Sequence, residues 1–165
     1  MEFEKLKCVS ENVQLDDYLQ LYKYVRDNMN NPEWLGTFEK EEIIDILSNG
    51  GKIWLYYDNN KTVCSMFYIP ANNKSLLKHN IQYDENIVGS LGPIMVSPDY
   101  VGNGFQTRMM LQLEEYCKNI GKKYIFTKAH SENLFSINNM IKNKYELVHK
   151  YKNERGDMSA FLKEI

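Results

Sequence analysis

Apolar residues recur along the chain with two different periods, which predict alternating helices and strands. Spacings of four, three and three positions separate Leu15, Leu19, Tyr22 and Val25, and this is the spacing of one face of an α-helix. A second run, from residue 105 to residue 120, has spacings of four, four, three and four. Other segments are rich in β-branched and aromatic residues, which is typical of strands.

Taken in order, these segments predict a β-α-α-β-β-β-α-β-α-β-β chain of the mixed α/β class. Thr37 is the predicted N-cap of the second helix, and Gly50-Gly51 ends it. The central β-α-β unit predicts a right-handed parallel crossover. Two predicted turns, at residues 58–61 and 153–157, join strands into hairpins. The expected strands cover residues 3–9, 53–57, 62–69, 87–96, 123–129, 146–151 and 159–163, and the expected helices cover residues 15–25, 38–47, 105–120 and 133–143.

Two segments depart from regular structure. The predicted strand 87–96 contains Gly89, Gly92 and Pro93, which indicates a β-bulge or a place where a backbone or a ligand comes close. The polar segment 71–86 is expected to be an irregular loop with one helical turn around residues 75–79. Loops of this length inside a compact domain are often functional.

A glycine loop joins the predicted strand 87–96 to the long helix that begins at Phe105. A helix start offers unpaired backbone N–H groups and the positive end of a dipole, so this loop is a candidate phosphate site. A dinucleotide-binding fingerprint is disfavoured, because a third glycine at the required spacing is missing.

Composition and charge narrow the function classes. The chain has 165 residues, and its formal net charge of -2 argues against a protein that binds nucleic acid by neutralising phosphates. Its three cysteines are far apart and odd in number, which indicates buried free thiols and neither a zinc site nor a disulfide framework. Neither a signal-peptide start nor an apolar run of about 20 residues is visible. We therefore expect one domain spanning residues 1–165 in the cytoplasm, with no metal, no nucleic acid and no membrane as partner.

Two motifs, together with the order of elements, carry a resemblance to a known family. The first is the segment Val96-x-Pro98-x-Tyr100-x-Gly102-Asn103-Gly104-Phe105-Gln106. The second is Ala129-His130-Ser131-Glu132-Asn133-Leu134-Phe135-Ser136, followed by Lys144-Tyr145-Glu146-Leu147-Val148. Over nearly the whole chain, these features resemble the GNAT superfamily of acyl-CoA-dependent N-acyltransferases. The resemblance implies a central mixed sheet of about six to seven strands flanked by about four helices.

The resemblance also implies a set of residues that bind acetyl-CoA as co-substrate. The pantetheine arm would pair with the bulged strand at Ile94, Met95 and Val96, and a backbone N–H near Ile94 would stabilise the oxyanion. Asn133 would hydrogen-bond this arm, and Ser136 would line its channel. The pyrophosphate would be bound by the backbone N–H groups of Val101, Gly102, Asn103, Gly104, Phe105 and Gln106.

Four positions differ from the pattern of the family. Val101 stands where Arg or Gln is most common, and Gln106 stands where Gly or Ala is usual, so Gln106 could crowd the phosphate or donate to it. Met140 aligns with the Tyr that commonly protonates the leaving thiolate. Lys144 replaces the usual Gly before the aromatic Tyr145.

Several side chains have two readings. His130 follows the strand 123–129 and could act as a base towards an amine, because the pKa of imidazole is near neutrality; the alternative, which we favour, is that it only orders the loop to Asn133. Tyr145 is read as a core residue that could reach the thiolate. The loop residues Tyr83 and Glu85 either shape the acceptor pocket or are solvated, the second being favoured. His79 is expected in a loop and His149 on the outward side of a strand, while Trp54, Tyr56, Tyr57, Phe67 and Tyr68 are expected in the sheet core.

These features predict an N-acetyltransferase. A primary amine of a small molecule or a peptide would attack the thioester of acetyl-CoA directly in a ternary complex. Two alternatives stay open: a non-catalytic CoA-binding or sensory domain of the same fold, and a structural interaction domain that binds no CoA. An exposed last strand could pair two subunits into a homodimer.

Overall fold

One mixed β-sheet forms the centre of the molecule. The structure is a computed structural model, and it describes residues 1–10 and 14–165. Short 3₁₀ turns lie at Phe3–Lys5, Pro32–Trp34, Glu85–Ile87 and Pro98–Tyr100. The described elements are β1 (Lys7–Val9), α1 (Leu15–Asp27), α2 (Lys40–Ser48), β2 (Lys52–Asp58), β3 (Lys61–Pro70), α3 (Asn73–Lys78), β4 (Val88–Val96), α4 (Phe105–Asn119), β5 (Tyr124–His130), α5 (Leu134–Lys142), β6 (Glu146–Asn153) and β7 (Gly156–Glu164).

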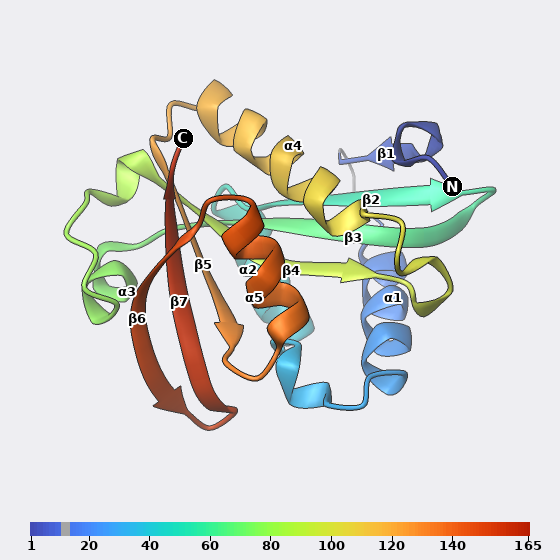
Figure 1. The fold of residues 1–165 in the computed structure, drawn as a ribbon. Coiled ribbons are helices and arrows are strands. Elements are labelled where there is room, and N and C mark those ends of the chain that lie inside the picture. Colours follow the sequence, from blue (N-terminus) through green and yellow to red (C-terminus); the bar gives the residue numbers. More distant parts are fainter. Residues whose placement is uncertain (11–13) are drawn as a thin grey trace.

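The sheet has the strand order β1-β2-β3-β4-β5-β7-β6 (Figure 1). Neighbouring strands are antiparallel except β4 and β5, which are parallel and are joined through α4. This arrangement confirms the predicted mixed α/β class and the predicted order of elements. Within the described residues the sheet has seven strands and is accompanied by five α-helices. The expected number of helices was about four; the fifth is α3, a short helix where one helical turn was expected.

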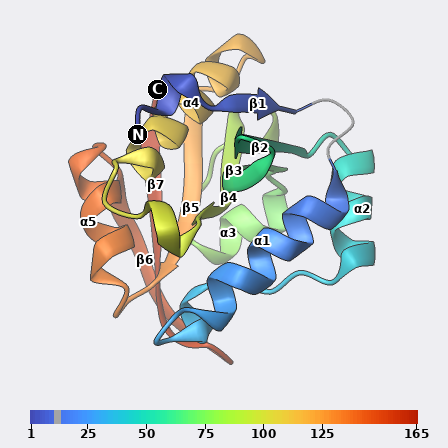
Figure 2. The ribbon, with the colours of Figure 1, turned by 90° about the vertical axis from the view of Figure 1, so that its right-hand side faces the viewer.

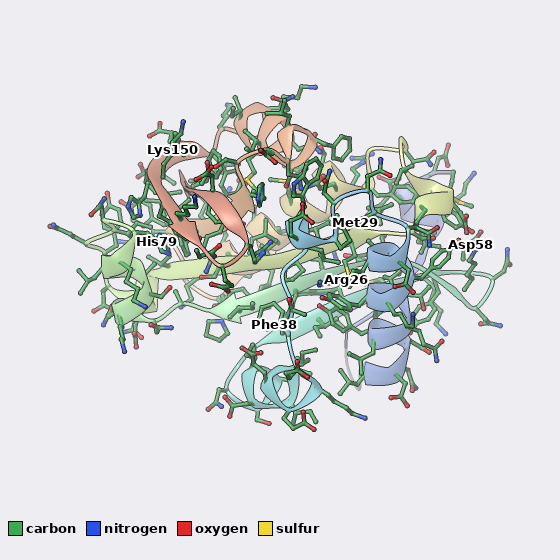
Figure 3. All side chains as sticks on the ribbon, turned by 90° about the horizontal axis from the view of Figure 1, so that it is seen from below. Arg26, Met29, Phe38, Asp58, His79 and Lys150 are labelled. Carbon is green, nitrogen blue, oxygen red and sulfur yellow. The ribbon has the colours of Figure 1, made fainter. Side chains whose placement is uncertain are left out.

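Helices α4 and α5 lie on one side of the sheet and α1 and α2 on the other (Figure 2), and side-chain alternation along the strands divides the core between these sides. In β2, Ile53 and Leu55 face the cluster that α1 and α2 cover, whereas Trp54 and Tyr56 face the cluster that α4 and α5 cover. Such alternation follows from the two-residue period of a strand. A third cluster joins α3 to the same face as α1 and α2 at the other end of the sheet. Figure 3 shows this end, with His79, opposite the end that carries Asp58.

A bulge in β4 changes the direction of the strand. Met66 of β3 pairs with Ile94, but Tyr68 pairs with Leu91, so Gly92 and Pro93 together stand opposite Phe67. The predicted irregularity of this strand is therefore confirmed as a β-bulge. It holds the proline at a place where a missing N–H does not interrupt the ladder.

Strands β4 and β5 pair only at their first residues and then separate. The parallel register covers Val88–Ser90 of β4 and Tyr124–Phe126 of β5. One residue further along, the Thr127 hydroxyl donates to the Leu91 carbonyl at 3.1 Å. Past this point the two strands are not paired with each other, which leaves an opening at their carboxyl ends.

Some predicted boundaries are wrong. The first strand is shorter than expected, because Phe3–Lys5 forms a 3₁₀ turn. Helix α2 has Glu39, and not Thr37, as its N-cap. Phe38 packs on Phe67 at a ring-centroid distance of 5.9 Å, and this packing keeps Phe38 outside the helix. The last hairpin turns at residues 154–155, because Lys152 already pairs with Asp157.

The exposure of the cysteines and of the aromatic residues can be compared with expectation. Cys64 and Cys117 are buried as expected, but Cys8 is exposed because it lies on the edge strand β1. Among the described residues, no helix combines the length and the apolar character needed to cross a membrane. Trp54, Tyr56, Phe67 and Tyr68 are buried and confirm the expected aromatic core, while Tyr57 is half-buried.

Candidate active site

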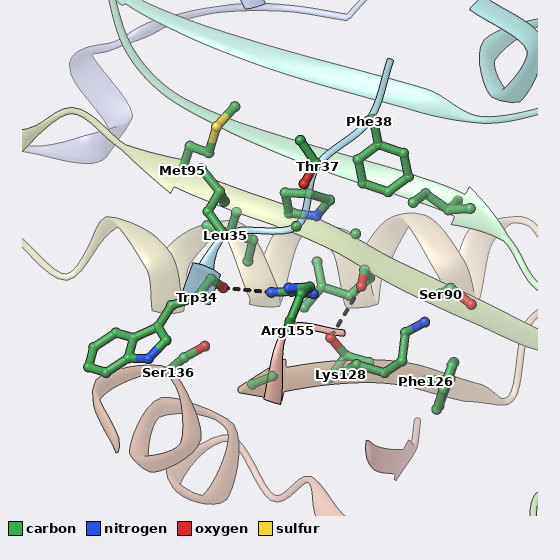
Figure 4. Close-up of a pocket in the computed structure, with 18 of the residues that line it drawn as sticks. Trp34, Leu35, Thr37, Phe38, Ser90, Met95, Phe126, Lys128, Ser136 and Arg155 are labelled. Atoms are coloured by element: carbon green, nitrogen blue, oxygen red, sulfur yellow. Dashed lines mark hydrogen bonds between the residues drawn. The ribbon is translucent and has the colours of Figure 1, made fainter. Parts of the chain in front are cut away.

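A cavity of about 920 Å³ occupies the opening between β4 and β5. Its wall includes the stretch of β4 from Ser90 to Val96 and the stretch of β5 from Phe126 to Ala129. Figure 4 shows part of this wall. Of the predicted cofactor-binding residues, the cavity brings together Ile94, Met95, Val96, Val101, Gln106, Asn133 and Ser136. A cavity of this size lies within the range of small-molecule sites.

The loop that leads into α4 keeps its main-chain N–H groups free of partners inside the protein. Among the hydrogen bonds of the described residues, none has a main-chain N–H of residues 101–107 as its donor. Tyr100 still donates to the Ser97 carbonyl and Arg108 to the Gly104 carbonyl, so the unpaired stretch lies between these two residues. Unpaired N–H groups at a helix start form a site for an anion.

Two glycines give this loop its shape. Gly102 has φ of +84° and Gly104 has φ of +73°, values that L-residues with side chains rarely adopt. A Cβ atom built on either residue meets no atom within 4 Å, so the space above both is open to a ligand. Gly102, Asn103 and Gly104 are exposed, whereas Phe105 is buried in the core that α4 shares with the sheet.

The backbone of β4 offers further hydrogen-bonding groups. The Ser97 N–H donates to the Val63 carbonyl at 2.7 Å. Paired residues of an antiparallel ladder alternate between bonded and non-bonded, and the register pairs Val96 with Cys64 and Ile94 with Met66. The N–H and C=O groups of Ile94 and Val96 therefore point away from β3, towards the side from which β5 has separated.

Helix α5 supplies the opposite wall. Asn133 is its N-cap, and its side-chain oxygen accepts the Ser136 N–H at 3.2 Å. The Asn139 amide donates to Gln106 Oε1 at 2.7 Å. Gln106 of α4 is thus held against α5 and does not fill the space above the glycine loop.

The amino-acid sequence of this chain also matches the model of a known protein family. A family model described as the acetyltransferase (GNAT) family matches residues 16–140. The chain belongs to the GNAT family. No curated protein sequence gives a significant match.

Solved structures share the fold of this GNAT protein at low sequence identity. The ribosomal-protein-S18-alanine N-acetyltransferase of Escherichia coli has a TM-score of 0.72 and 12% identity, with 97% of this chain and 94% of that chain covered. A probable acetyltransferase of Staphylococcus epidermidis has a TM-score of 0.72 and 16% identity, covering 97% and 98%. A GNAT family acetyltransferase of Elizabethkingia anophelis with acetyl-CoA bound has a TM-score of 0.70 and 12% identity, covering 98% and 99%.

His130 of the GNAT protein is buried and both of its ring nitrogens are engaged. Nδ1 accepts the Glu132 N–H at 3.2 Å, so the proton sits on Nε2, which donates to the Arg155 carbonyl at 2.9 Å. The ring does not line the cavity. This geometry favours the role of ordering the loop to Asn133 over the role of base.

Met140 and Tyr145 occupy different places in the GNAT protein. Met140 is buried and lines the cavity, where its thioether cannot donate a proton. Tyr145 is 4% exposed, and its hydroxyl is buried with no partner among the described residues. Burial raises the pKa of this phenol. Tyr145 does not line the cavity. It is a residue of the hydrophobic core that α4 and α5 cover.

The half of the cavity away from α4 contains residues that the sequence analysis missed. Arg155, in the β6–β7 turn, donates from Nε to the Glu33 carbonyl at 2.9 Å and from Nη2 to the Trp34 carbonyl at 3.0 Å. Figure 4 shows the Arg155 side chain crossing the cavity, with Lys128 and Phe126 beside it. An arginine in a polar turn carries no signal of such a long-range contact. Tyr83 and Glu85 do not line the cavity; Tyr83 stacks on Tyr124, and Glu85 accepts the Asn73 N–H.

The two remaining histidines lie close together. His149 is on the strand β6 and His79 follows α3 as its C-cap, as a strand and a loop position were expected, but His79 is buried, with 6% of its surface exposed. Its Nδ1 lies 3.3 Å from Nδ1 of His149, and its ring packs on Phe126 and Tyr151. Burial, with the nearby positive charges of Lys128, His149 and Lys78, lowers the pKa of His79 to about 4.

Proposed function

We propose that this GNAT protein is an N-acetyltransferase that moves the acetyl group of acetyl-CoA to a primary amine by direct attack in a ternary complex. One observation carries the proposal: among the described residues, the main-chain N–H groups of residues 101–107 have no hydrogen-bond acceptor, and Val101 and Gln106 at the two ends of the glycine loop line the cavity between β4 and β5. A small molecule or a peptide would supply the amine, and the proposed compartment is the cytoplasm.

The residues present fit the co-substrate. The pyrophosphate of CoA is an anion, and the open glycine loop at the start of α4 offers donors and the positive end of a helix dipole. Val101 lacks a charged side chain but keeps its amide. Ile94 and Val96 would pair with the pantetheine arm in the manner of an added strand, which agrees with the free side of β4. Asn133 and Ser136 would line the opposite side of that arm.

The chemistry then requires little from side chains. Acetyl-CoA supplies an activated acetyl group. The amine nitrogen forms a bond to the thioester carbon, the C–S bond breaks, and the thiolate leaves with the electron pair. The Ile94 N–H, which points away from β3, would stabilise the negative charge that develops on the carbonyl oxygen. Holding both reactants in one cavity would supply much of the acceleration.

Proton transfer would rely on solvent. His130 donates and accepts within the protein, and Met140 has no proton to give. We therefore propose that water carries the proton from the ammonium ion, and that water protonates the thiolate. A thiolate is a stable enough leaving group for this, because the pKa of a thiol is about 8.5.

One observation favours a second candidate function. Met140 stands in the cavity where an acid is common in the family that the chain resembles, so a CoA-binding domain without turnover is the alternative. It predicts affinity for acetyl-CoA without release of free thiol in the presence of any amine.

Calorimetric titration with acetyl-CoA, followed by a thiol-release screen across amine classes, tests the proposal. Gly104→Glu places a carboxylate in the phosphate site, and we expect it to weaken acetyl-CoA binding at least about tenfold, or about 1.4 kcal/mol. Gly121→Glu is the matched control, because Gly121 also has positive φ (+82°) and open space around its Cβ position. Equal affinity of both variants for acetyl-CoA would overturn the proposed phosphate site. Binding of acetyl-CoA without thiol release would support the alternative, a CoA-binding domain without turnover.

A further inference from the structure

A second cavity, of about 640 Å³, lies where α3 meets β5 and β6. We call it the lysine–histidine pocket. Within the described residues its lining contains three lysines and two histidines, and no aspartate or glutamate. The lining residues are Asn72, Lys74, Ser75, Lys78, His79, Lys128, His149, Tyr151 and Asn153.

The three lysines of this pocket have no salt-bridge partner in the part of the chain that the structure describes. Among the salt bridges of the described residues, none involves Lys74, Lys78 or Lys128. The pKa of Lys128 is lowered, first by burial and then by the positive charges of Arg155 and Lys78. Like charges gathered without a partner raise the free energy of the empty pocket, and an anion would relieve that repulsion.

The histidine pair adds hydrogen-bonding groups of the right kind. The two Nδ1 atoms are 3.3 Å apart, so one Nδ1 donates to the other, and the ring that accepts carries its proton on Nε2. The rings are positioned by Phe126 and Tyr151. A metal cation is disfavoured here, because the lysines would repel it.

The lysine–histidine pocket adjoins the cavity of the proposed active site. Four residues line both cavities: Asn72, Ser75, Lys128 and Asn153. They belong to the half of the active-site cavity that Arg155 crosses, away from the glycine loop of α4. A molecule that fills this half can therefore extend one end into the lysine–histidine pocket.

We propose that the lysine–histidine pocket binds an oxyanion, a carboxylate or a phosphate group, carried by the acceptor amine. The assignment of the anion to the acceptor amine rests on the proposed function. Anion binding by the pocket does not, because it needs no turnover. Lys78 of α3 and Lys128 of β5 attract the anion, and the histidine N–H and the Asn153 side chain donate to it. The acceptor class is thus an amine with an acidic group at its other end, such as an amino acid, an acidic peptide or a phosphorylated amine.

Direct binding tests the first half. We would titrate the protein with inorganic phosphate and, separately, with glutarate, and follow the ring C–H signals of His79 and His149 by NMR. We expect saturable shifts that weaken with added salt. In Lys78→Gln and in Lys128→Gln the dissociation constant should rise at least about fivefold. Lys123→Gln, at an exposed lysine before β5, removes the same charge outside the pocket and should leave it unchanged.

Matched amines test the second half. Phosphoethanolamine is compared with ethanolamine, and β-alanine with β-alaninamide, in the thiol-release assay. We expect kcat/KM to be at least about tenfold higher for the acidic member of a pair, and the ratio to fall towards one in the Lys78→Gln/Lys128→Gln double variant. Binding of acetyl-CoA by this variant should be unchanged.

The possible failures are distinguishable. Absent phosphate and glutarate binding, with acetyl-CoA binding intact, overturns the pocket and leaves the proposed function in place. Anion binding without preference for acidic amines overturns the assignment of the anion to the acceptor. Absent acetyl-CoA binding overturns the proposed function, while the NMR titration still decides whether the pocket takes an anion.

Discussion

Asn139 of α5 donates a hydrogen bond from its side-chain amide to Gln106 Oε1 of α4 at 2.7 Å. Gln106 stands at a position where the family that the chain resembles usually has a small residue. The Gln106 Nε2 atom lies 3.5 Å from the Ser136 hydroxyl, so both the oxygen and the nitrogen of the Gln106 side-chain amide face α5. This contact keeps a bulky side chain out of the glycine loop.

Asn139→Ala should therefore weaken acetyl-CoA binding. Without its partner, the Gln106 side chain can turn into the loop and compete with the pyrophosphate for space and donors. We expect the dissociation constant to rise about three- to tenfold and the free energy of unfolding to fall by about 1 kcal/mol. Calorimetry measures the dissociation constant, and urea unfolding measures the free energy of unfolding. Asn138→Ala, at the exposed neighbour on α5, should change neither; an unchanged affinity in Asn139→Ala would contradict this role.

Lys144→Gly should stabilise the protein. Lys144 is exposed and has φ of +66°, a conformation that costs a residue with a Cβ atom about 1–2 kcal/mol. Glycine relieves this strain but gives the unfolded chain more entropy, so we expect a net gain of about 0.5–1 kcal/mol in urea unfolding. Lys142→Gly, at the last residue of α5, should instead destabilise, by up to the about 1 kcal/mol that glycine costs in a helix interior. Similar losses in both variants would show that Lys144 carries no strain.

Tyr145→Phe should raise stability and leave turnover unchanged. The Tyr145 hydroxyl is buried and has no hydrogen-bond partner among the described residues, and removing an unsatisfied buried polar group recovers about 1–3 kcal/mol. Thermal unfolding and thiol release measure the two effects. A large fall in kcat with stability intact would instead identify Tyr145 as the acid that protonates the thiolate.

His79 predicts a loss of stability on acidification. Its pKa is lowered to about 4 in the folded protein, whereas an unfolded histidine has a pKa of about 6.5. Between these values the unfolded chain binds a proton that the folded protein does not, so the unfolding free energy falls as the pH drops through this range. His79→Gln removes this proton uptake. Urea unfolding at neutral pH and near pH 5 should show a smaller loss in the variant, and parallel losses would contradict the lowered pKa.

Local patterns were enough to predict most of the fold. Helical spacing from residue 105 to 120 and the glycines and proline of β4 identified α4 and the bulge, because each depends on residues that are close in sequence. The N-cap of α2 was misplaced because Phe38 is used in packing on Phe67, a contact between segments that the sequence does not relate. Packing between distant segments overrides local propensity in such cases.

In the candidate site, too, features formed by neighbouring residues were predictable, and contacts between distant segments were not. The loop from Val101 to Gln106 and the N-cap Asn133 could be located, because the resemblance rests on continuous motifs. Arg155 and the pair of His79 and His149 could not, because the sheet brings them to the cavities from residues far apart in the chain. For His130 the sequence left two roles open and favoured the ordering of the loop to Asn133. Its hydrogen bonds agree, because Nδ1 accepts from Glu132 in that loop and Nε2 donates to Arg155 in the β6–β7 turn.

In the proposed complex, the free main-chain N–H groups of residues 101–107 bind the pyrophosphate of CoA. Titration of the ¹⁵N-labelled protein with CoA, and in parallel with pantetheine, which lacks the phosphates, tests it most directly. We expect CoA to produce the largest amide shifts at Gly102, Gly104 and Gln106, and pantetheine to leave these amides in place while shifting those of Ile94 and Val96. Saturation with CoA that leaves the amides of Gly102 and Gly104 unmoved would contradict it.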